Sequence, residues 1–218
     1  MILAIDTATE FAGLALYNAD TVWAEEIWHA AQNHTAELAP RLRRMLQQAN
    51  LSPAELEGIA VSIGPGSYTG LRIGLALAKG LALPHRLPLV GVPTLEITAY
   101  PHRNQTLPVV ALARAGRGRI LAARYHSDGN GWQETAPPHL LALAELAPQI
   151  TEPALVAGEI TAQEAADLCQ QTQNRAQVAG PIHRVRRPGV LAELGALKLT
   201  RGEPDDPAGL TPLYLKEP

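Results

Sequence analysis

The hydrophobic pattern at the start of the chain predicts three consecutive β-strands. Apolar residues dominate positions 2–5, 12–17 and 22–28, although the third run also contains Glu25 and Glu26. Turn-forming residues around Asn18 and Asp20 separate the second run from the third. Short apolar runs bounded by turn residues are typical of strands. Because the connections between the runs are short, we expect the three strands to form an antiparallel meander.

An alternation of helices and strands follows the meander. Apolar side chains at positions 38, 42, 45, 46 and 49 have helical spacing. A β-branched run at 59–63 then leads into Gly64-Pro65-Gly66 and a second helical segment that is almost wholly apolar. A strand is predicted at 89–92 and a helix from Thr94. This order predicts one α/β layer that ends near Tyr100.

The second half of the chain predicts a smaller α/β layer. Residues 102–105 have the composition of a linker, so we divide the chain into a domain at 1–104 and a domain at 105–218. The last segment is apolar enough to dock, and its return to the first domain is one option. The pattern predicts strands at 109–113, 120–125, 155–157 and 177–179 and helices at 140–146, 162–171 and 190–199.

The helical segment after Gly66 is apolar on nearly every side. Its small residues recur at every fourth position, as Gly70, Gly74, Ala78 and Ala82, and therefore form one ridge along the helix. A ridge without large side chains allows another backbone to approach closely. Such a helix must be buried nearly all round. One side can lie on the chain's own sheet, and we expect a second protein to cover the other side.

Composition limits the classes of protein to consider. The chain has 218 residues, of which 46% are hydrophobic, and this is enough to build a core. The single cysteine, Cys169, rules out a disulfide framework and is typical of a reducing compartment. The N-terminus lacks the basic region of a signal peptide, and no uncharged apolar run reaches membrane-spanning length. We therefore expect a cytoplasmic protein that makes no contact with a membrane.

The charge balance argues against tight, independent binding to nucleic acid. The net charge is −3 and aromatic residues make up 4% of the chain, whereas phosphate neutralisation requires a basic face. Arginines gather locally at 114–124 and at 184–187. A plain RNA-binding module is therefore an alternative that salt-dependent tRNA binding by the isolated chain would support.

Two loops contain residues suited to phosphate. The segment GPGSYTG at 64–70 presents backbone N–H groups before a helix, but its spacing fits neither the P-loop nor the dinucleotide pattern. A tight turn with close helix packing is favoured there. Asp6, Thr7 and Thr9 follow the first strand, where they can hold a metal–phosphate complex or bond the local backbone, and spacing alone favours an ordinary turn.

The sequence contains no recognisable catalytic constellation. No two of the seven histidines are three or four residues apart, so no helix presents a histidine metal pair. A GxSxG nucleophile motif is missing, and Cys169 lies in an apolar helical pattern that favours packing over nucleophilic chemistry. We predict no catalytic residue and no metal ligand.

Several segments together resemble the TsaB (YeaZ) family. They are MILAIDTAT at 1–9, NHTAELAP at 33–40, GPGSYTGLRIGLALAKGLAL at 64–83, GVPTLE at 91–96 and PLYL at 212–215. The resemblance implies an α/β protein with the actin-like ATPase (ASKHA, ribonuclease H-like) fold, built of two lobes of which the second is reduced. It also implies a role in forming N6-threonylcarbamoyladenosine next to the anticodon of tRNAs that read ANN codons.

The resemblance implies a scaffold rather than an enzyme. TsaD-type proteins carry a histidine pair after the strand that follows the glycine loop, whereas residues 91–96 here contain no histidine, which makes a poor metal site. Asp6, Thr7 and Thr9 match the family's phosphate-side motif. This match implies weak nucleotide contact, with no cofactor tightly bound and with ATP or ADP at the junction of the complex. Residues 114–121 carry arginines where the family often has acidic residues. A role that this segment has in other family members is therefore not carried over to this chain.

The resemblance also implies partners. The helix at 70–83, with the helix at 38–49 beside it, is expected to meet equivalent helices of the transferase TsaD, or of a second copy when TsaD is absent. The ATPase TsaE would join them, and tRNA would be contacted indirectly through the complex. The predicted interface residues are Leu38, Leu42, Met45, Gly70, Leu71, Gly74, Leu75, Ala78 and Ala82. The alternatives are a glycoprotease-like peptidase and an independent actin-like ATPase.

Overall fold

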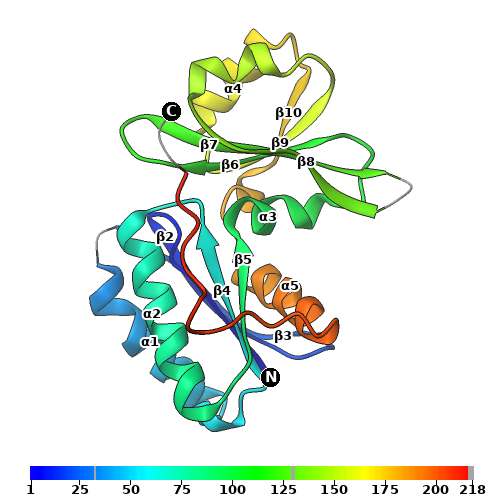
Figure 1. Ribbon diagram of the computed structural model, residues 1–218. Helices are drawn as coiled ribbons and strands as arrows, with labels where there is room; N and C mark the ends of the chain where they lie inside the picture. The colour runs from blue at the N-terminus through cyan, green and yellow to red at the C-terminus, as the bar shows by residue number, and fades with distance from the viewer. Residues whose placement is uncertain (32, 129–130, 216–218) are drawn as a thin grey trace. The chain divides into compact units, whose positions relative to one another are not determined.

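The chain folds into two compact units (Figure 1). A computed structural model describes residues 1–31, 33–128 and 131–215. The first unit comprises Met1–Thr94 and Arg187–Tyr214, and the second is built mainly from Leu95–Arg186. The division therefore falls after Thr94 rather than after residue 104, and the chain returns to the first unit at Arg187. Among the described residues no helix is both long and apolar enough to cross a membrane.

The sheet of the first unit has the strand order β3-β2-β1-β4-β5. β1 (Ile2–Asp6), β2 (Phe11–Tyr17) and β3 (Val22–His29) form the predicted antiparallel meander. β4 (Gly58–Gly64) and β5 (Leu89–Pro93) continue the sheet in parallel with β1. The parallel strands need crossover helices, which are α1 (His34–Gln48) and α2 (Tyr68–His85). A single 3₁₀ turn, η1 (Pro53–Glu55), follows α1.

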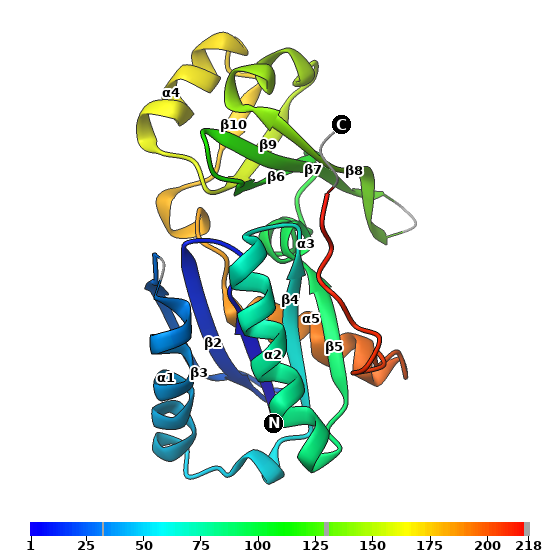
Figure 2. The ribbon, with the colours of Figure 1, turned by 60° about the vertical axis from the view of Figure 1, so that its left-hand side comes forward.

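Successive side chains of a strand point to opposite faces of the sheet, so the two faces of this sheet carry different residues. Large residues of β1 and β4, such as Leu3, Ile5 and Ile59, form one core cluster with residues of α1 and α2. Helix α5 (Pro188–Thr200) packs on β1, β2 and β4 from the other side (Figure 2). There, a Cβ at Gly195 would come to 2.5 Å from the Cβ of Ala60, so α5 depends on small residues for its close approach.

The second unit is also a five-stranded sheet, of order β10-β9-β6-β7-β8. β6 and β7 form the predicted hairpin, and β9 and β10 add parallel strands beside β6. One core cluster joins the sheet to α4, and a second joins its other face to Leu95 and Ala99 of α3. The bounds of these elements are α3 (Thr94–Ala99), η2 (Tyr100–His102), β6 (Val109–Arg114), β7 (Arg119–Asp128), β8 (Gly131–Ala142), η3 (Leu143–Glu145), η4 (Ala147–Gln149), β9 (Ala154–Gly158), α4 (Ala162–Gln171), β10 (Ala176–Val178) and η5 (Pro181–His183).

The helix predicted at 140–146 is wrong. Leu140 and Leu141 pair with Leu121 and Ile120 as the last part of β8, and only a 3₁₀ turn, η3, follows. A short apolar run has no period that separates strand from helix. Pairing with the long partner strand β7 decides the structure, which is why the sequence pattern alone missed β8.

Candidate functional site

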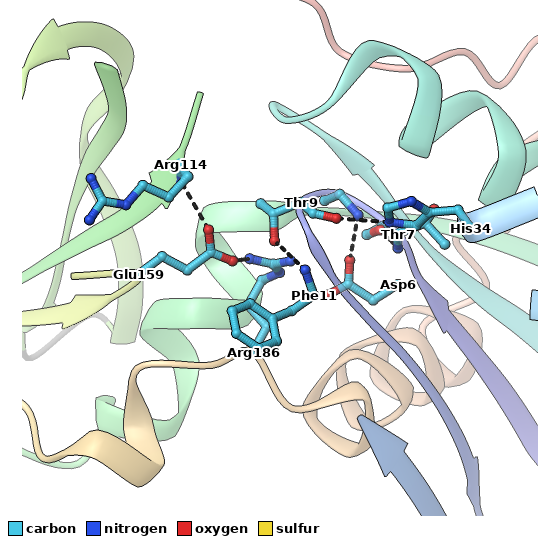
Figure 3. A network of polar contacts seen from close by, with 10 residues as sticks. Asp6, Thr7, Thr9, Phe11, His34, Arg114, Glu159 and Arg186 are labelled. Atoms are coloured by element: carbon cyan, nitrogen blue, oxygen red, sulfur yellow. Dashed lines mark hydrogen bonds and ion pairs between the residues drawn. The ribbon is translucent and has the colours of Figure 1, made fainter. Parts of the chain in front are cut away.

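The loop after β1 is closed by its own side chains (Figure 3). A carboxylate oxygen of Asp6 accepts a hydrogen bond from the backbone N–H of Ala8 at 3.0 Å. The Thr7 hydroxyl donates to the carbonyl oxygen of Gly70 at 2.7 Å. Asp6, Thr7 and Thr9, the predicted nucleotide contacts, are 2%, 0% and 3% exposed. Their side chains therefore face the protein interior, where they hold the loop together.

Residues that the sequence did not single out complete this loop. His34, the first residue of α1, places its Nε2 at 2.9 Å from the carbonyl oxygen of Thr9 and is 5% exposed. The Ser62 hydroxyl accepts the N–H of Thr7 at 3.3 Å. The N–H of Ser67 donates to the carbonyl oxygen of Ala8 at 2.6 Å. A single histidine or serine has no spacing pattern, so only the three-dimensional structure could reveal these partners.

The glycines of GPGSYTG are required by this loop. A Cβ at Gly66 would overlap the carbonyl oxygen of Ala8, and a Cβ at Gly70 would overlap the carbonyl oxygen of Thr7. At Gly74 the Cβ would overlap the Thr7 hydroxyl. The geometry is thus the tight turn with close helix packing that the motif spacing favoured. Nucleotide contact through Asp6, Thr7 and Thr9 stays a prediction.

The residues predicted to contact a partner lie instead in the core of the first unit. The seven hydrophobic side chains among them are 6% exposed or less, and the two glycines are also buried. They cannot reach another protein while the unit is folded, so the prediction is wrong for Leu38, Leu42, Met45, Gly70, Leu71, Gly74, Leu75, Ala78 and Ala82. Because α2 is apolar on both sides, its period could not tell which side faces the sheet.

The opposite side of α2 is a second apolar surface. We call it the outer face of α2, and it consists of Arg72, Ile73, Ala76, Leu77, Gly80 and Leu83. Leu83 is 62% exposed, Ala76 and Gly80 are also exposed, and Ile73 and Leu77 are partly buried. Outside the backbone of α2 itself, a Cβ at Gly80 would meet no atom within 4 Å among residues 1–31, 33–128 and 131–215. A glycine inside a helix costs about 0.5–1 kcal/mol relative to alanine, and the chain's own packing does not explain this one.

The C-terminal segment docks beside the start of α2, as its composition predicted. The N–H of Leu213 donates to the carbonyl oxygen of Ile63 at 2.7 Å. The Tyr214 hydroxyl accepts a hydrogen bond from Nε of Arg72 at 2.9 Å, and the Arg72 guanidinium lies 3.9 Å from the centre of the Tyr68 ring. These contacts fix an exposed arginine and two tyrosines at one end of the outer face.

The second unit contains a buried ion pair at the end of β9 (Figure 3). The guanidinium of Arg186 donates to Oε1 of Glu159 at 2.7 Å, and the backbone N–H of Arg114 donates to Oε2 at 3.0 Å. Arg186 is 4% exposed and Glu159 9% exposed. The Arg114 side chain pairs with Glu164. Arg114, the first residue of the atypical arginine segment, thus has a structural role.

Within 1–31, 33–128 and 131–215, no group of three or more histidine, cysteine, aspartate or glutamate side chains gathers as a metal ion would require. Two histidines of the second unit do meet, His102 and His183, with ring centres 5.4 Å apart.

Several proteins with similar sequences are named for one process, the formation of threonylcarbamoyladenosine in tRNA. Residues 28–202 match the family described as TsaD, tRNA N6-adenosine threonylcarbamoyltransferase. The tRNA threonylcarbamoyladenosine biosynthesis protein TsaB of Bacillus subtilis is 32% identical over 218 residues, covering 99% of this chain and 93% of that protein. The TsaB of Escherichia coli is 40% identical over 133 residues, covering 60% of this chain and 57% of that protein.

Solved structures confirm the predicted fold class. YeaZ from Pseudomonas aeruginosa superposes with a TM-score of 0.77 at 23% identity, covering 98% of this chain and 99% of that one. The activator of the 2-hydroxyisocaproyl-CoA dehydratase from Clostridium difficile, solved with bound ADPNP, has a TM-score of 0.53 at 8% identity, covering 94% of this chain and 98% of that one. The chain therefore has the two-lobed α/β architecture of actin-like ATPases.

Proposed function

Since this chain belongs to the TsaB (YeaZ) family, we propose that it is a non-catalytic subunit in the formation of threonylcarbamoyladenosine in tRNA. In this proposal it assembles with the transferase TsaD and supplies a binding surface rather than reacting groups. The names of the TsaB relatives support a role in threonylcarbamoyladenosine formation. The polar side chains of the loop after β1 face inward and bond the protein's own backbone, which supports a subunit without catalytic residues.

The outer face of α2 is the surface we propose for assembly. Its support is Gly80, which is exposed and lies inside a helix. Apart from the backbone of that helix, no atom of the described residues lies within 4 Å of its Cβ position. A site without a side chain lets a second helix approach closely, which is a reason to retain a glycine that destabilises its own helix. Ile73, Leu77 and Leu83 beside it supply apolar area, at about 25 cal/mol per Å² buried.

A single substitution can test the surface. Ala76→Arg places a long charged side chain on the outer face at an exposed position, where it leaves the core of the first unit intact. The matched control is Ala166→Arg, on an exposed position of α4 in the second unit. We expect Ala76→Arg to weaken binding to TsaD of the same genome at least tenfold and to reduce tRNA modification in the reconstituted reaction.

Light scattering after size exclusion would measure the assembly. A complex of wild type and TsaD that Ala166→Arg preserves and Ala76→Arg loses supports the proposal. If the wild-type chain forms no complex with TsaD, the scaffold function is refuted. If both variants bind equally well, the function survives but the outer face of α2 is not the interface. Binding of TsaE and of ATP or ADP to the assembled complex stay predictions.

A further inference from the structure

A groove opens on the first unit, on the side of its sheet that α5 covers. Its walls are the start of β1, the turn between β2 and β3, the residue before β4 and the last turns of α5 (Figure 1). The volume of the groove is about 510 Å³. Pockets that hold small molecules measure roughly 300–1,000 Å³. The groove is therefore large enough for a small organic ligand.

Much of the lining of the groove is apolar. The side chains of Ile2, Leu197 and Leu199 line it. Ala196 lines it too, and its small side chain leaves space that a larger residue would fill. Leu197 is 38% exposed, so apolar surface at this place faces water in the free chain. Removing such surface from water is favourable, and the apolar body of a ligand would do so.

The charged side chains of the groove are carboxylates, those of Glu57 and Glu193. Oε2 of Glu57 lies 2.8 Å from the N-terminal ammonium group of Met1, so this wall already binds one ammonium. None of the described residues that line the groove is lysine, arginine or histidine. Lys198, the neighbour of two lining residues, bonds the carbonyl oxygen of Gly91 instead. The groove therefore favours a positively charged ligand over an anion.

The lining residues of α5 also set a length. Those with helical spacing are Glu193, Ala196, Leu197 and Thr200. Residues three, four and seven apart lie on one side of a helix. From Glu193 to Thr200 the helix advances about 10 Å. This stripe has a carboxylate at one end, an apolar middle and a hydroxyl at the other end, which suits a short molecule with one charged end.

We propose that this groove binds a small organic cation that joins an ammonium group to an apolar body. The ammonium pairs with the carboxylate of Glu193, and the body covers Ala196 and Leu197. Tyr17 also lines the groove, and aromatic rings attract cations. The inference is independent of the proposed function, because α5 and α2 cover opposite faces of the first sheet.

A pair of probes tests the sign of the charge. Phenethylamine is a cation at neutral pH, and 3-phenylpropionate is its control because it joins a similar apolar body to a carboxylate. We expect the full chain to bind phenethylamine with a Kd of about 1 mM or lower, and 3-phenylpropionate at least tenfold more weakly. Titrations followed by NMR should shift the amide signals of residues 17–19 and 193–200. No binding of phenethylamine, or equal affinity for the two probes, would overturn the inference.

Two variants test the site itself. Glu193→Gln removes one negative charge at nearly constant size, and Ala196→Leu fills the groove without changing its charge. We expect each to weaken phenethylamine binding about tenfold or more, while Glu203→Gln, an exposed position outside the groove, behaves as wild type. Thermal unfolding would verify that each variant is folded. Because the two variants act separately, a folding defect in one leaves the other as the test. Wild-type affinity in either folded variant would overturn the inference.

Discussion

At the scale of single residues, the glycines of α2 have two different roles. Gly74 is buried against the Thr7 hydroxyl, whereas Gly80 is exposed with open space at its Cβ position. We expect Gly80→Ala to raise the free energy of unfolding by about 0.5–1 kcal/mol. Gly74→Ala should lower it by about 1–3 kcal/mol, since the Cβ overpacks a closed site. Urea denaturation of the isolated chain measures both, and a shift of the same sign in both variants would contradict this assignment.

The same residues show what a sequence can predict about a site. The four-residue spacing of Gly70 and Gly74 correctly indicated a close backbone approach. It could not identify the neighbour, which is the chain's own Thr7 rather than another protein. Gly80 falls outside that spacing, and its significance becomes visible only once the structure shows that nothing covers it.

At the scale of elements, two short helical turns of the second unit bring a pair of histidines together. The rings of His102 in η2 and His183 in η5 lie 5.4 Å apart, and within the described residues Nε2 of His102 is buried without a hydrogen-bond partner. Burial, and then the nearby His183, lower the pKa of His102 below its ordinary value of 6.5. The folded state therefore binds fewer protons than the unfolded state near that pH.

The consequence is a stability that falls on the acidic side. Because the unfolded state takes up more protons, the free energy of unfolding decreases as the pH falls through about 6.5. His102→Phe should unfold with a smaller difference in Tm between pH 8 and pH 5 than wild type. His139→Phe, at an exposed histidine, serves as the control and should keep the wild-type difference. An unchanged pH dependence in His102→Phe would rule out this pair as its source.

Elements with a clear period were predictable, and those defined by their neighbours were not. The meander, α2 and α4 were recognised from spacing and turn residues, and α4 matches its predicted bounds of 162–171. Strand β8 was missed because most of its residues are exposed and its sequence includes Pro137 and Pro138, which weaken any strand signal. Its hydrogen bonds to β7 define it.

At the scale of the whole molecule, the domain division predicted from the sequence assigned helix α5 to the wrong domain. Helix α5 lies far from β1 in sequence, yet it covers one face of the first sheet, where the ideal Cβ of Gly58 would lie 2.6 Å from Leu199. Its position after the second unit suggested membership of the second domain. Only packing shows that Leu191 and Ala192, both fully buried, complete the first unit.

This division makes a prediction about fragments. Residues 1–104 alone would leave one apolar face of the sheet in water, so we expect the fragment to aggregate or to lack a cooperative unfolding transition. Residues 1–94 joined by a flexible glycine–serine linker to 187–218 contain α5 and should unfold cooperatively, with dispersed amide signals in an NMR spectrum. Replacing Leu191 and Leu194 by aspartate in the joined chain is the control, since both side chains are buried. A folded 1–104 fragment would show that α5 is not needed to complete the first unit, whereas failure of 1–104 and rescue by α5 would establish the first unit as an independent fold made from two distant segments.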